Sequence, residues 1–158
     1  MDNNHKKRSN PDNSRKTQRT FAFQVLYALN FVPGTDSLEK TYARFQNESS
    51  PALWGEGSFS WSLVHGVWKN FDDLNSIIAS YSQNWKIQRI AKIEITILRL
   101  AVYEMRYCPD IPLKVAINEG IELAKIFGDD SSRNFVNGIL DAVAKDIKNG
   151  KFGISKGF

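Results

Sequence analysis

The chain has 158 residues, of which 42% are hydrophobic and 12% aromatic, so a single folded domain with a real core is expected. This composition excludes a chain that is disordered throughout. The formal net charge is +4, and residues 1–20 supply all of it with six Lys and Arg against two Asp. A neutral body with a basic arm suggests a polyanionic partner, most simply nucleic acid; a solubilising tail is the alternative.

Cysteine content and hydropathy limit the cellular compartments in which the protein is expected. The single cysteine, Cys108, excludes an internal disulfide and a CxxC zinc site, and it favours a reducing, cytoplasmic setting. The first twenty residues are polar and basic and contain no secretory signal. The most apolar segment, residues 93–107, carries four charged side chains, so no membrane span is expected.

The N-terminal half predicts helices joined by polar loops. Residues 1–13 are polar, lack apolar periodicity, and are predicted to form a disordered arm. A helix is predicted from an N-cap at Ser14 to about Phe31, followed by Pro33-Gly34 as its stop. A short helix over 37–45 and a loop over 46–57 come next.

Two long helical patterns occupy the middle of the chain. The first covers residues 58–81, where Gly66 or the 70–73 stretch is expected to bend or divide it. The second covers residues 88–107 and is apolar almost all round, which predicts a helix buried on most faces at the centre of the fold. Cys108-Pro109 ends it.

The last third predicts two more helices. One runs over 112–127, with Pro112 as its first residue and Gly128 as its C′ residue. The other runs over 132–148, after capping residues at 129–131 and before Gly150. With no strand pattern, the expected class is all-α, with about seven helices around one elongated core. Residues 14–150 are predicted to form one domain and residues 151–158 a short tail.

A search for catalytic or metal-binding chemistry finds little. His5 lies in the arm, and His65 lies on an apolar helix without a second ligand at metal spacing. Cys108 is predicted to be a buried, inert thiol. The pairs Asp72-Asp73 and Asp129-Asp130 stand at helix or loop ends, where capping explains them. No phosphate loop or nucleophile motif is present, so we expect no enzyme activity, no cofactor and no metal.

The first helix predicts a nucleic-acid surface. Arg15, Lys16 and Arg19 fall within about one third of its circumference, and Phe23 and Tyr27 continue that face. Cations followed by aromatics suit single-stranded RNA, which needs phosphate contacts and stacking surfaces. The alternative is a solvated first turn followed by core aromatics.

The stretch VAINEGIELAKIFG, residues 115–128, carries an Asn118–Glu119 pair inside an amphipathic helix. On a helical wheel both residues flank the apolar face and do not converge on a site. Gly120 lies on the apolar face and would allow another helix to approach closely. We therefore interpret the pair as a packing element.

Several segments together resemble one known family. IPLKVAINEGIELAKIFG followed by SSRNFVNGILD is similar to the C-terminal signature of the NusB family of bacterial transcription antitermination factors. ILRLAVYEM and the basic first helix RKTQRTFAFQVLYAL are similar to the same family. The resemblance covers about residues 14–148, although 46–85 match only in pattern. It implies an all-helical fold of two packed three-helix subdomains and no enzyme activity.

The resemblance also implies partners. Family members pair with NusE, a small-subunit ribosomal protein, and the heterodimer binds the boxA element of nascent RNA within an RNA polymerase antitermination complex. Such a complex promotes read-through, notably of ribosomal RNA operons. Partner contacts are implied for Tyr27 and Glu94.

RNA contacts are implied for two regions. The first is the basic N-terminus, with Arg15, Lys16 and Arg19 and, as helpers, Lys6, Lys7 and Arg8. The sequence SNPDNS splits these basic residues into two groups, which departs from the single block expected of the family. The second region is the entry to the last helix. Its implied residues are Ser131, Arg133 and Phe135.

Two other functions remain open at this stage. Some ribosomal RNA cytosine methyltransferases carry a NusB-like N-terminal domain, so the chain could be a fragment of one; its end at Phe158, without a methyl-donor domain, argues against this. A helical protein-interaction module with an incidental basic tail is the other. A homodimer of the free protein is also left open.

Overall fold

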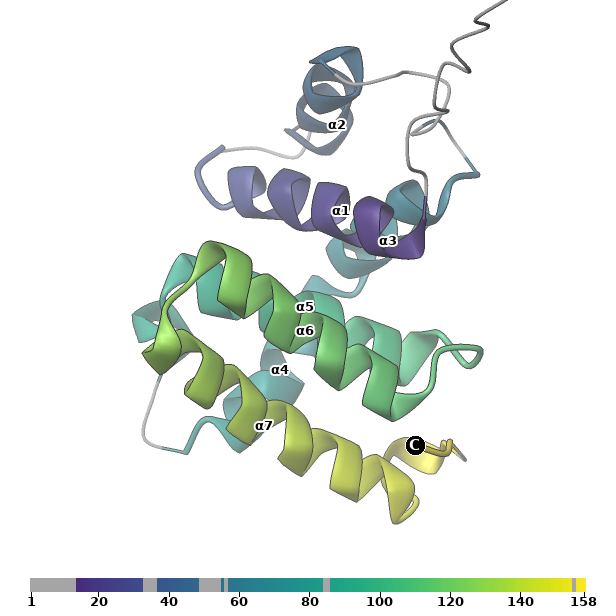
Figure 1. Ribbon diagram of the computed structural model, residues 1–158, viewed down its shortest axis with the longest axis vertical. Helices are drawn as coiled ribbons and strands as arrows, with labels where there is room; N and C mark the ends of the chain where they lie inside the picture. Colours follow the sequence, from purple (N-terminus) through teal and green to yellow (C-terminus); the bar gives the residue numbers. More distant parts are fainter. Residues whose placement is uncertain (1–13, 33–36, 49–54, 56, 84–85, 155) are drawn as a thin grey trace, which may run out of the picture.

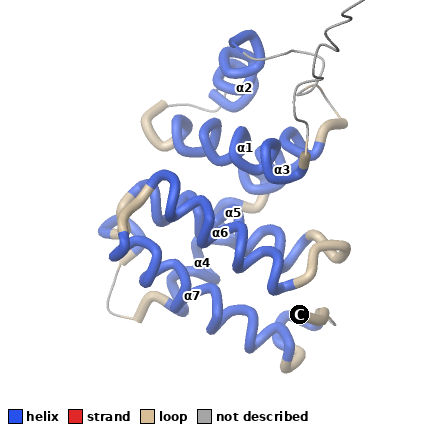
Figure 2. Tube along the Cα trace, viewed as in Figure 1, coloured by secondary structure: helices blue, strands red, loops and turns tan. Residues whose placement is uncertain are grey.

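The computed structural model describes residues 14–32, 37–48, 55, 57–83, 86–154 and 156–158, and the predicted arm over 1–13 lies outside them. All regular structure in the described residues is helical (Figures 1 and 2). The elements are α1 (Arg15–Leu29), α2 (Ser37–Glu48), α3 (Phe59–Lys69), α4 (Phe71–Tyr81), η2 (Ile87–Arg89), α5 (Lys92–Tyr107), α6 (Leu113–Phe127), α7 (Asp130–Lys148) and η3 (Lys151–Gly153).

Helix α1 begins where the sequence predicts. The Ser14 side chain accepts a hydrogen bond from the Thr17 backbone N–H at 3.2 Å, which satisfies one of the free donors of the first turn. The helix ends at Leu29, and the Asn30 side chain donates to the Tyr27 carbonyl at 3.0 Å. The predicted stop at Pro33-Gly34 lies outside the described residues.

The predicted long helix over 58–81 is two helices. Asn70 lies between α3 and α4 with φ −105° and ψ 21°, which is not helical, and its side chain donates to the Gly66 carbonyl at 2.8 Å. The division predicted for the 70–73 stretch is therefore confirmed. The Ser58 side chain caps α3 by accepting from the Trp61 N–H at 3.1 Å.

Helix α5 is the central element. It begins at Lys92, four residues later than predicted, because Ile87–Arg89 forms a 3₁₀ turn and Ile90 is extended. Ten of its sixteen residues are buried, which confirms the prediction from its all-round apolar pattern. It contacts α1 and α3 on one side and α4, α6 and α7 on the other.

The observed ends of α6 and α7 differ in detail from the predicted ones. Pro112 precedes α6 as its cap residue, and Gly128 follows α6 with φ −111°, so it does not take the left-handed conformation of a C′ glycine. Gly128 is needed for space, since a Cβ there would lie 2.8 Å from the Ser132 Cβ. Helix α7 starts two residues earlier than predicted because Asp129 caps it, accepting from the Ser132 N–H at 2.8 Å.

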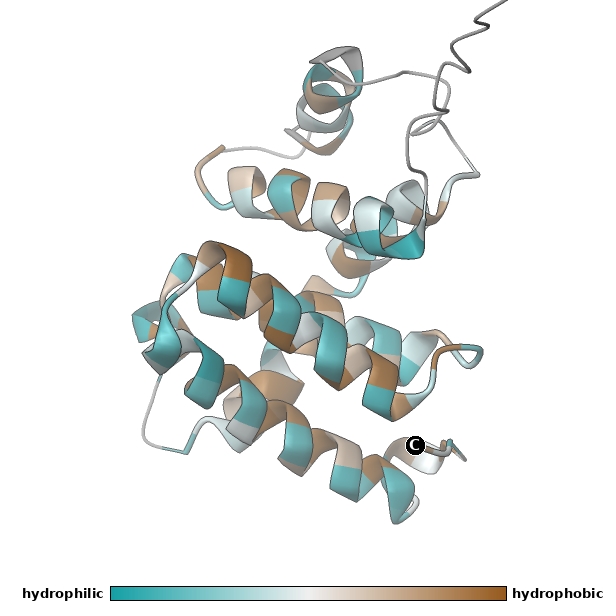
Figure 3. Cartoon of the chain, viewed as in Figure 1, coloured by the Kyte–Doolittle hydropathy of each residue, from teal (hydrophilic) through white to brown (hydrophobic). Residues whose placement is uncertain are grey.

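The helices form two groups that meet along α5. Helices α1, α2 and α3 make the N-terminal group, and α5, α6 and α7 make a three-helix bundle with α4 packed beside it (Figure 1). Hydrophobic residues gather where the helices face one another (Figure 3), and one buried cluster extends through both groups. No helix in the described ranges has the length and hydrophobicity needed to span a membrane.

Two glycines permit close helix contacts. A Cβ on Gly120 would lie 2.8 Å from Leu140 Cδ1, so α6 and α7 approach closely there, as predicted. A Cβ on Gly66 would lie 2.0 Å from the Tyr103 hydroxyl, because that ring lies directly over the α3 backbone. The contact at Gly66 joins α3 to α5 and has no signal in the sequence.

The C-terminal tail packs onto the bundle. The Lys156 ammonium donates to the carbonyls of Glu104 and Cys108, each at 2.8 Å, and so satisfies free acceptors at the end of α5. The Leu113 N–H donates to the Gly157 carbonyl at 3.2 Å. The tail therefore closes the end of the bundle opposite the α6–α7 turn (Figure 1).

Candidate nucleic-acid and partner interface

Two of the predicted cations at the start of α1 face solvent. The Arg15 side chain is 55% exposed, and its guanidinium donates to the Asp110 carboxylate at 2.9 Å. The same guanidinium lies over the Phe59 ring, 4.6 Å from its centroid. Lys16 is exposed and has no ion pair within the described part of the chain. Both side chains are therefore available to phosphate groups.

The Arg15–Asp110 pair does not block such a contact. Its hydrogen bond lowers the pKa of the Asp110 carboxyl below its ordinary value, so this carboxyl is ionised at neutral pH. Because both side chains are more than half exposed, water and salt screen the attraction and little stabilisation is lost when it opens. Arg15 can exchange Asp110 for a phosphate.

The position of Arg19 contradicts its predicted role as an RNA contact on this face of α1. It is only 3% exposed, and its guanidinium donates to both carboxylate oxygens of Glu104 at 2.6–3.0 Å. A second carboxylate, that of Glu119, lies 3.6 Å away. A helical wheel places Arg19 beside Arg15 and Lys16, but two acids on α5 and α6 draw its side chain into the protein. Arg19 therefore acts in packing and is not free to contact RNA.

This ion pair also involves Glu119, one of the two residues that the sequence predicts to act in packing. Burial raises the pKa of the Glu104 carboxyl above its ordinary value, while the Arg19 guanidinium opposes that rise. Glu119 supplies a second negative charge to the same guanidinium, and Asn118 points to the exposed side of α6. The predicted packing role is thus found in Glu119, which links α6 to α1.

The aromatic continuation of the α1 face is only partly exposed. Phe23 is 2% exposed and packs against Phe127 with ring centroids 4.6 Å apart, so the predicted stacking role for Phe23 is wrong. Tyr27 is half-buried and meets Phe31 edge-on at 5.3 Å. Phe31 is 61% exposed, so the end of α1 presents an aromatic patch made of Tyr27 and Phe31.

A second cluster forms where α5 and α7 begin. Glu94, Ser131 and Phe135 line one hollow of about 250 Å³, although the first is nearly forty residues from the others in sequence. Three neighbours complete its wall: Arg89, Ile90 and Ala91. The hollow therefore brings together Glu94, an implied contact for the partner protein, and Ser131 and Phe135, implied contacts for RNA.

Arg133 lies apart from that hollow. It lines a smaller hollow of about 160 Å³ together with Lys125 and the 128–130 turn, and its guanidinium donates to Asp130 at 3.0 Å. The carboxylate of Asp129 is engaged in capping α7, and the Ser132 N–H lowers its pKa. Asp129 thus caps α7, as predicted, and Asp130 forms an ion pair with Arg133.

The Tyr27–Phe31 patch at the end of α1 lies near the hollow lined by Glu94, Ser131 and Phe135. The Arg19–Glu119 and Phe23–Phe127 contacts show that α1 runs along α6 in the same direction. The end of α1 therefore lies near the α6–α7 turn, from which Ser131 follows (Figure 1). Two contributors, Phe59 and Arg89, had no signal in the sequence because their neighbours come from other helices. Lys6, Lys7 and Arg8 lie outside the described residues.

The described residues offer little for catalysis or metal binding. Among them, no three His, Cys, Asp or Glu side chains gather closely enough to hold a metal ion. Cys108 is only partly buried, so the predicted full burial is wrong, but its surroundings still raise the pKa of the thiol to about 11, which favours low reactivity.

Comparison with known proteins identifies the family. A sequence model of the NusB family matches residues 16–145. The transcription antitermination protein NusB of Oleidesulfovibrio alaskensis is 54% identical over 144 residues, which cover 88% of this chain and 92% of that protein. The protein of the same name from Bacillus pumilus is 44% identical and covers 85% of this chain and 97% of its own length.

Solved structures share the fold. T. maritima NusB aligns with a TM-score of 0.72 at 30% identity, covering 84% of this chain and 92% of that one. A chain in a crystal structure of antitermination factors NusB and NusE with double-stranded RNA aligns with a TM-score of 0.68 at 24% identity, covering 84% and 96%. At that identity the second likeness concerns the fold alone. With the family match spanning most of its length and a relative at 54% identity, this chain belongs to the NusB family.

Proposed function

We propose that the chain is a non-enzymatic transcription antitermination factor that acts in the cytoplasm. It binds boxA-type single-stranded RNA together with NusE and so promotes read-through by RNA polymerase, notably in ribosomal RNA operons. The relatives that carry the antitermination name match nearly the whole chain. The observation that carries the proposal is the hollow in which Glu94 meets Ser131 and Phe135.

The RNA path in this proposal runs over two groups of residues. Arg15 and Lys16 contact phosphates, because both are exposed cations. Phe135 offers a ring for base stacking, and Ser131 offers a hydroxyl at the same hollow. Arg89 adds a positive charge to its wall. Arg133 is a lesser contributor because it lines a separate, smaller hollow.

The NusE surface in this proposal combines the Tyr27–Phe31 patch with Glu94. An exposed aromatic patch combined with a half-buried carboxylate has the mixed character of a protein interface. Because Glu94 also lines the RNA hollow, a bound NusE would extend the RNA site. With this arrangement, NusE and the RNA would each bind the chain more tightly when the other is bound.

The proposal is tested by fluorescence anisotropy with a boxA-like RNA and a scrambled strand of equal length, each with and without NusE. We expect NusE to tighten binding to the boxA-like strand and to leave the scrambled strand unchanged. Equal weak binding of both strands, unaffected by NusE, would reject the proposal. Binding of NusE without any RNA affinity would identify the chain as a protein-interaction module.

Matched variants locate the RNA surface. Lys16→Gln and Arg15→Gln each remove one exposed cation and are expected to weaken RNA binding about threefold to tenfold, between the value of an exposed ion pair and that of a charge-assisted hydrogen bond. Lys145→Gln removes an exposed cation from the far part of α7 and serves as the control. An equal loss in all three variants would show that only net charge matters.

A further inference from the structure

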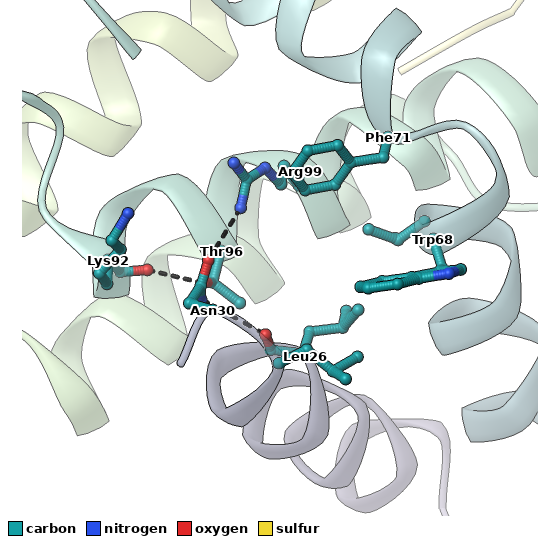
Figure 4. A pocket seen from close by; sticks show the side chains of 9 residues that line it. Leu26, Asn30, Trp68, Phe71, Lys92, Thr96 and Arg99 are labelled. Atoms are coloured by element: carbon teal, nitrogen blue, oxygen red, sulfur yellow. Dashed lines mark hydrogen bonds between the residues drawn. The ribbon is translucent and has the colours of Figure 1, made fainter. Parts of the chain in front are cut away.

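A pocket of about 240 Å³ opens where the two helix groups meet. Its walls come from α1, α3, the start of α4 and the start of α5. One wall is apolar or aromatic, with Leu26, Leu29, Val67, Trp68 and Phe71. The opposite wall is polar, with Asn30, Lys92, Thr96 and Arg99. Figure 4 shows Arg99 and Asn30 between the two aromatic rings on one side and Lys92 on the other.

Arg99 is a buried cation without a carboxylate partner among the described residues. It is 8% exposed, and its guanidinium donates to the side-chain oxygens of Asn75 at 2.8 Å and Asn30 at 3.1 Å. It also lies 4.3 Å from the centroid of the Phe71 ring. These contacts are with neutral groups, so they hold the guanidinium in place and leave its charge uncompensated.

That charge is costly to bury. Desolvation lowers the pKa of Arg99 to about 10, yet the group still carries its proton at neutral pH. Arg19 shows the contrasting case, since two carboxylates surround it. A guanidinium has five N–H donors, and the bonds to Asn75 and Asn30 use two of them. An anion in the pocket would be attracted by the charge of Arg99 and would accept hydrogen bonds from its remaining N–H donors.

The neighbouring groups favour one class of anion. Thr96 donates to the Lys92 carbonyl and accepts from Asn30, so the polar wall is pre-organised around Arg99. Lys92 adds a second positive charge. The aromatic wall is too apolar for a fully hydrated ion such as free phosphate, and it suits a hydrocarbon body. The volume is below the usual 300–1,000 Å³ of drug-sized pockets, which limits the ligand to a compact one.

We infer that this pocket binds a carboxylate carried on a compact apolar or aromatic body, with the carboxylate on Arg99 and Lys92 and the body between Leu26 and Trp68. The carboxylate is either that of a free organic acid or that of an acidic side chain of NusE. The site itself does not depend on the proposed RNA function, because its residues are outside the RNA path.

The first test titrates the protein alone with phenylacetate and follows its amide and arginine side-chain signals by NMR. We expect a millimolar Kd, as befits so small a ligand, with shifts at Asn30, Thr96 and the Arg99 Nε–H. Phenylacetamide has the same shape without the charge, and it should bind at least about tenfold more weakly. Equal binding of acid and amide, or no shift in these signals, would overturn the inference.

Variants confirm the location. Arg99→Gln should abolish binding of phenylacetate, and Lys92→Gln should weaken it about twofold to fivefold, as expected for a more exposed charge. Lys92 is exposed at the pocket rim, so its variant tests the site even if Arg99→Gln fails to fold. Lys145→Gln should leave the Kd unchanged. An unchanged Kd in Lys92→Gln, or in a folded Arg99→Gln, would contradict the assignment.

A last experiment distinguishes the two sources of the carboxylate. The titration is repeated with NusE present. If phenylacetate and NusE exclude one another, an acidic side chain of NusE occupies the pocket. If both bind at once, the ligand is a free acid. Because the first titration uses neither NusE nor RNA, its failure would leave the proposed function untouched, and the reverse also holds.

Discussion

Replacing Arg19 by methionine gives the sharpest test of its assignment to packing. The substitution keeps the apolar stem and removes the charge, so Glu104 would keep a buried carboxylate without its partner. The Glu104 side chain is only 1% exposed and accepts three hydrogen bonds from Arg19. Removing one partner of such a buried pair costs about 3–5 kcal/mol, because the remaining charge stays desolvated.

The expected change is large enough to measure by urea and by heat. For a domain of this size, 1 kcal/mol shifts the melting temperature by about 2–4 °C, so Arg19→Met should melt about 6–20 °C lower. Lys16→Gln is the matched control, since Lys16 is an exposed cation less than one turn away. Its free energy of unfolding should change by no more than about 0.5 kcal/mol.

The pH dependence gives a second, independent readout. Burial already raises the pKa of folded Glu104, and Arg19 is the main group that opposes this rise. Without Arg19 the folded pKa rises further above the unfolded value, so the folded state binds the proton more tightly. The free energy of unfolding of Arg19→Met should therefore increase as pH falls from above the folded pKa towards the unfolded one. The deficit relative to the native chain should shrink over this range.

A double variant and RNA binding complete the test. Adding Glu104→Gln to Arg19→Met removes the stranded charge and should recover part of the lost stability. The reasoning would be refuted if Arg19→Met unfolded within 1 kcal/mol of the native chain while losing RNA affinity as Lys16→Gln does. That result would mean that Arg19 leaves Glu104 to bind phosphate.

Three further variants or reactions test packing and burial. Gly66→Ala should lower the free energy of unfolding in urea by about 1–3 kcal/mol, because the Tyr103 ring must move from its place over α3; no change would mean that the ring is free to swing away. Gly120→Val should cost a similar amount, since its Cβ would meet Leu140, and an unaffected urea midpoint would show that α6 and α7 can separate at no cost. Cys108 should react with iodoacetamide at pH 8 about 100-fold more slowly than in the urea-unfolded chain, because a pKa of about 11 instead of 9.0 leaves that much less thiolate; equal rates would refute its burial.

Helix positions follow from local patterns, and these were readable in the sequence. The periodic apolar stripe and the Ser14 cap placed α1, and the all-round apolar pattern placed α5 at the centre. Boundaries were less exact, since the 3₁₀ turn before Lys92 and the early start of α7 depend on local backbone geometry. Of the two predicted places for a bend or break, Gly66 and the 70–73 stretch, the structure has the break at Asn70.

The roles of individual charges were harder to predict. A helical wheel gives Arg19 the same face as Arg15, but its partner Glu104 is 85 residues away, so nothing local reveals the burial. Arg99 presents the same difficulty, since Asn30 and Asn75 reach it from other helices. The family resemblance implies separate roles for Glu94 and Ser131, and no pattern in this chain predicts that they line one hollow. Long-range pairing decided which cations remain exposed.

The position of α5 as a wall shared by both groups has a consequence for the order in which the protein opens. Its amides lie between α1 and α3 on one side and α6 and α7 on the other, so they exchange hydrogen with solvent only when the whole domain unfolds. Helix α2 packs mainly on α1 and is the opposite case. Hydrogen exchange should therefore separate them, with α2 amides exchanging at a small fraction of the global unfolding free energy and the middle of α5 at its full value. The N-terminal group could in this way loosen at α2 while the Tyr27–Phe31 patch and the hollow lined by Glu94, Ser131 and Phe135 stay intact.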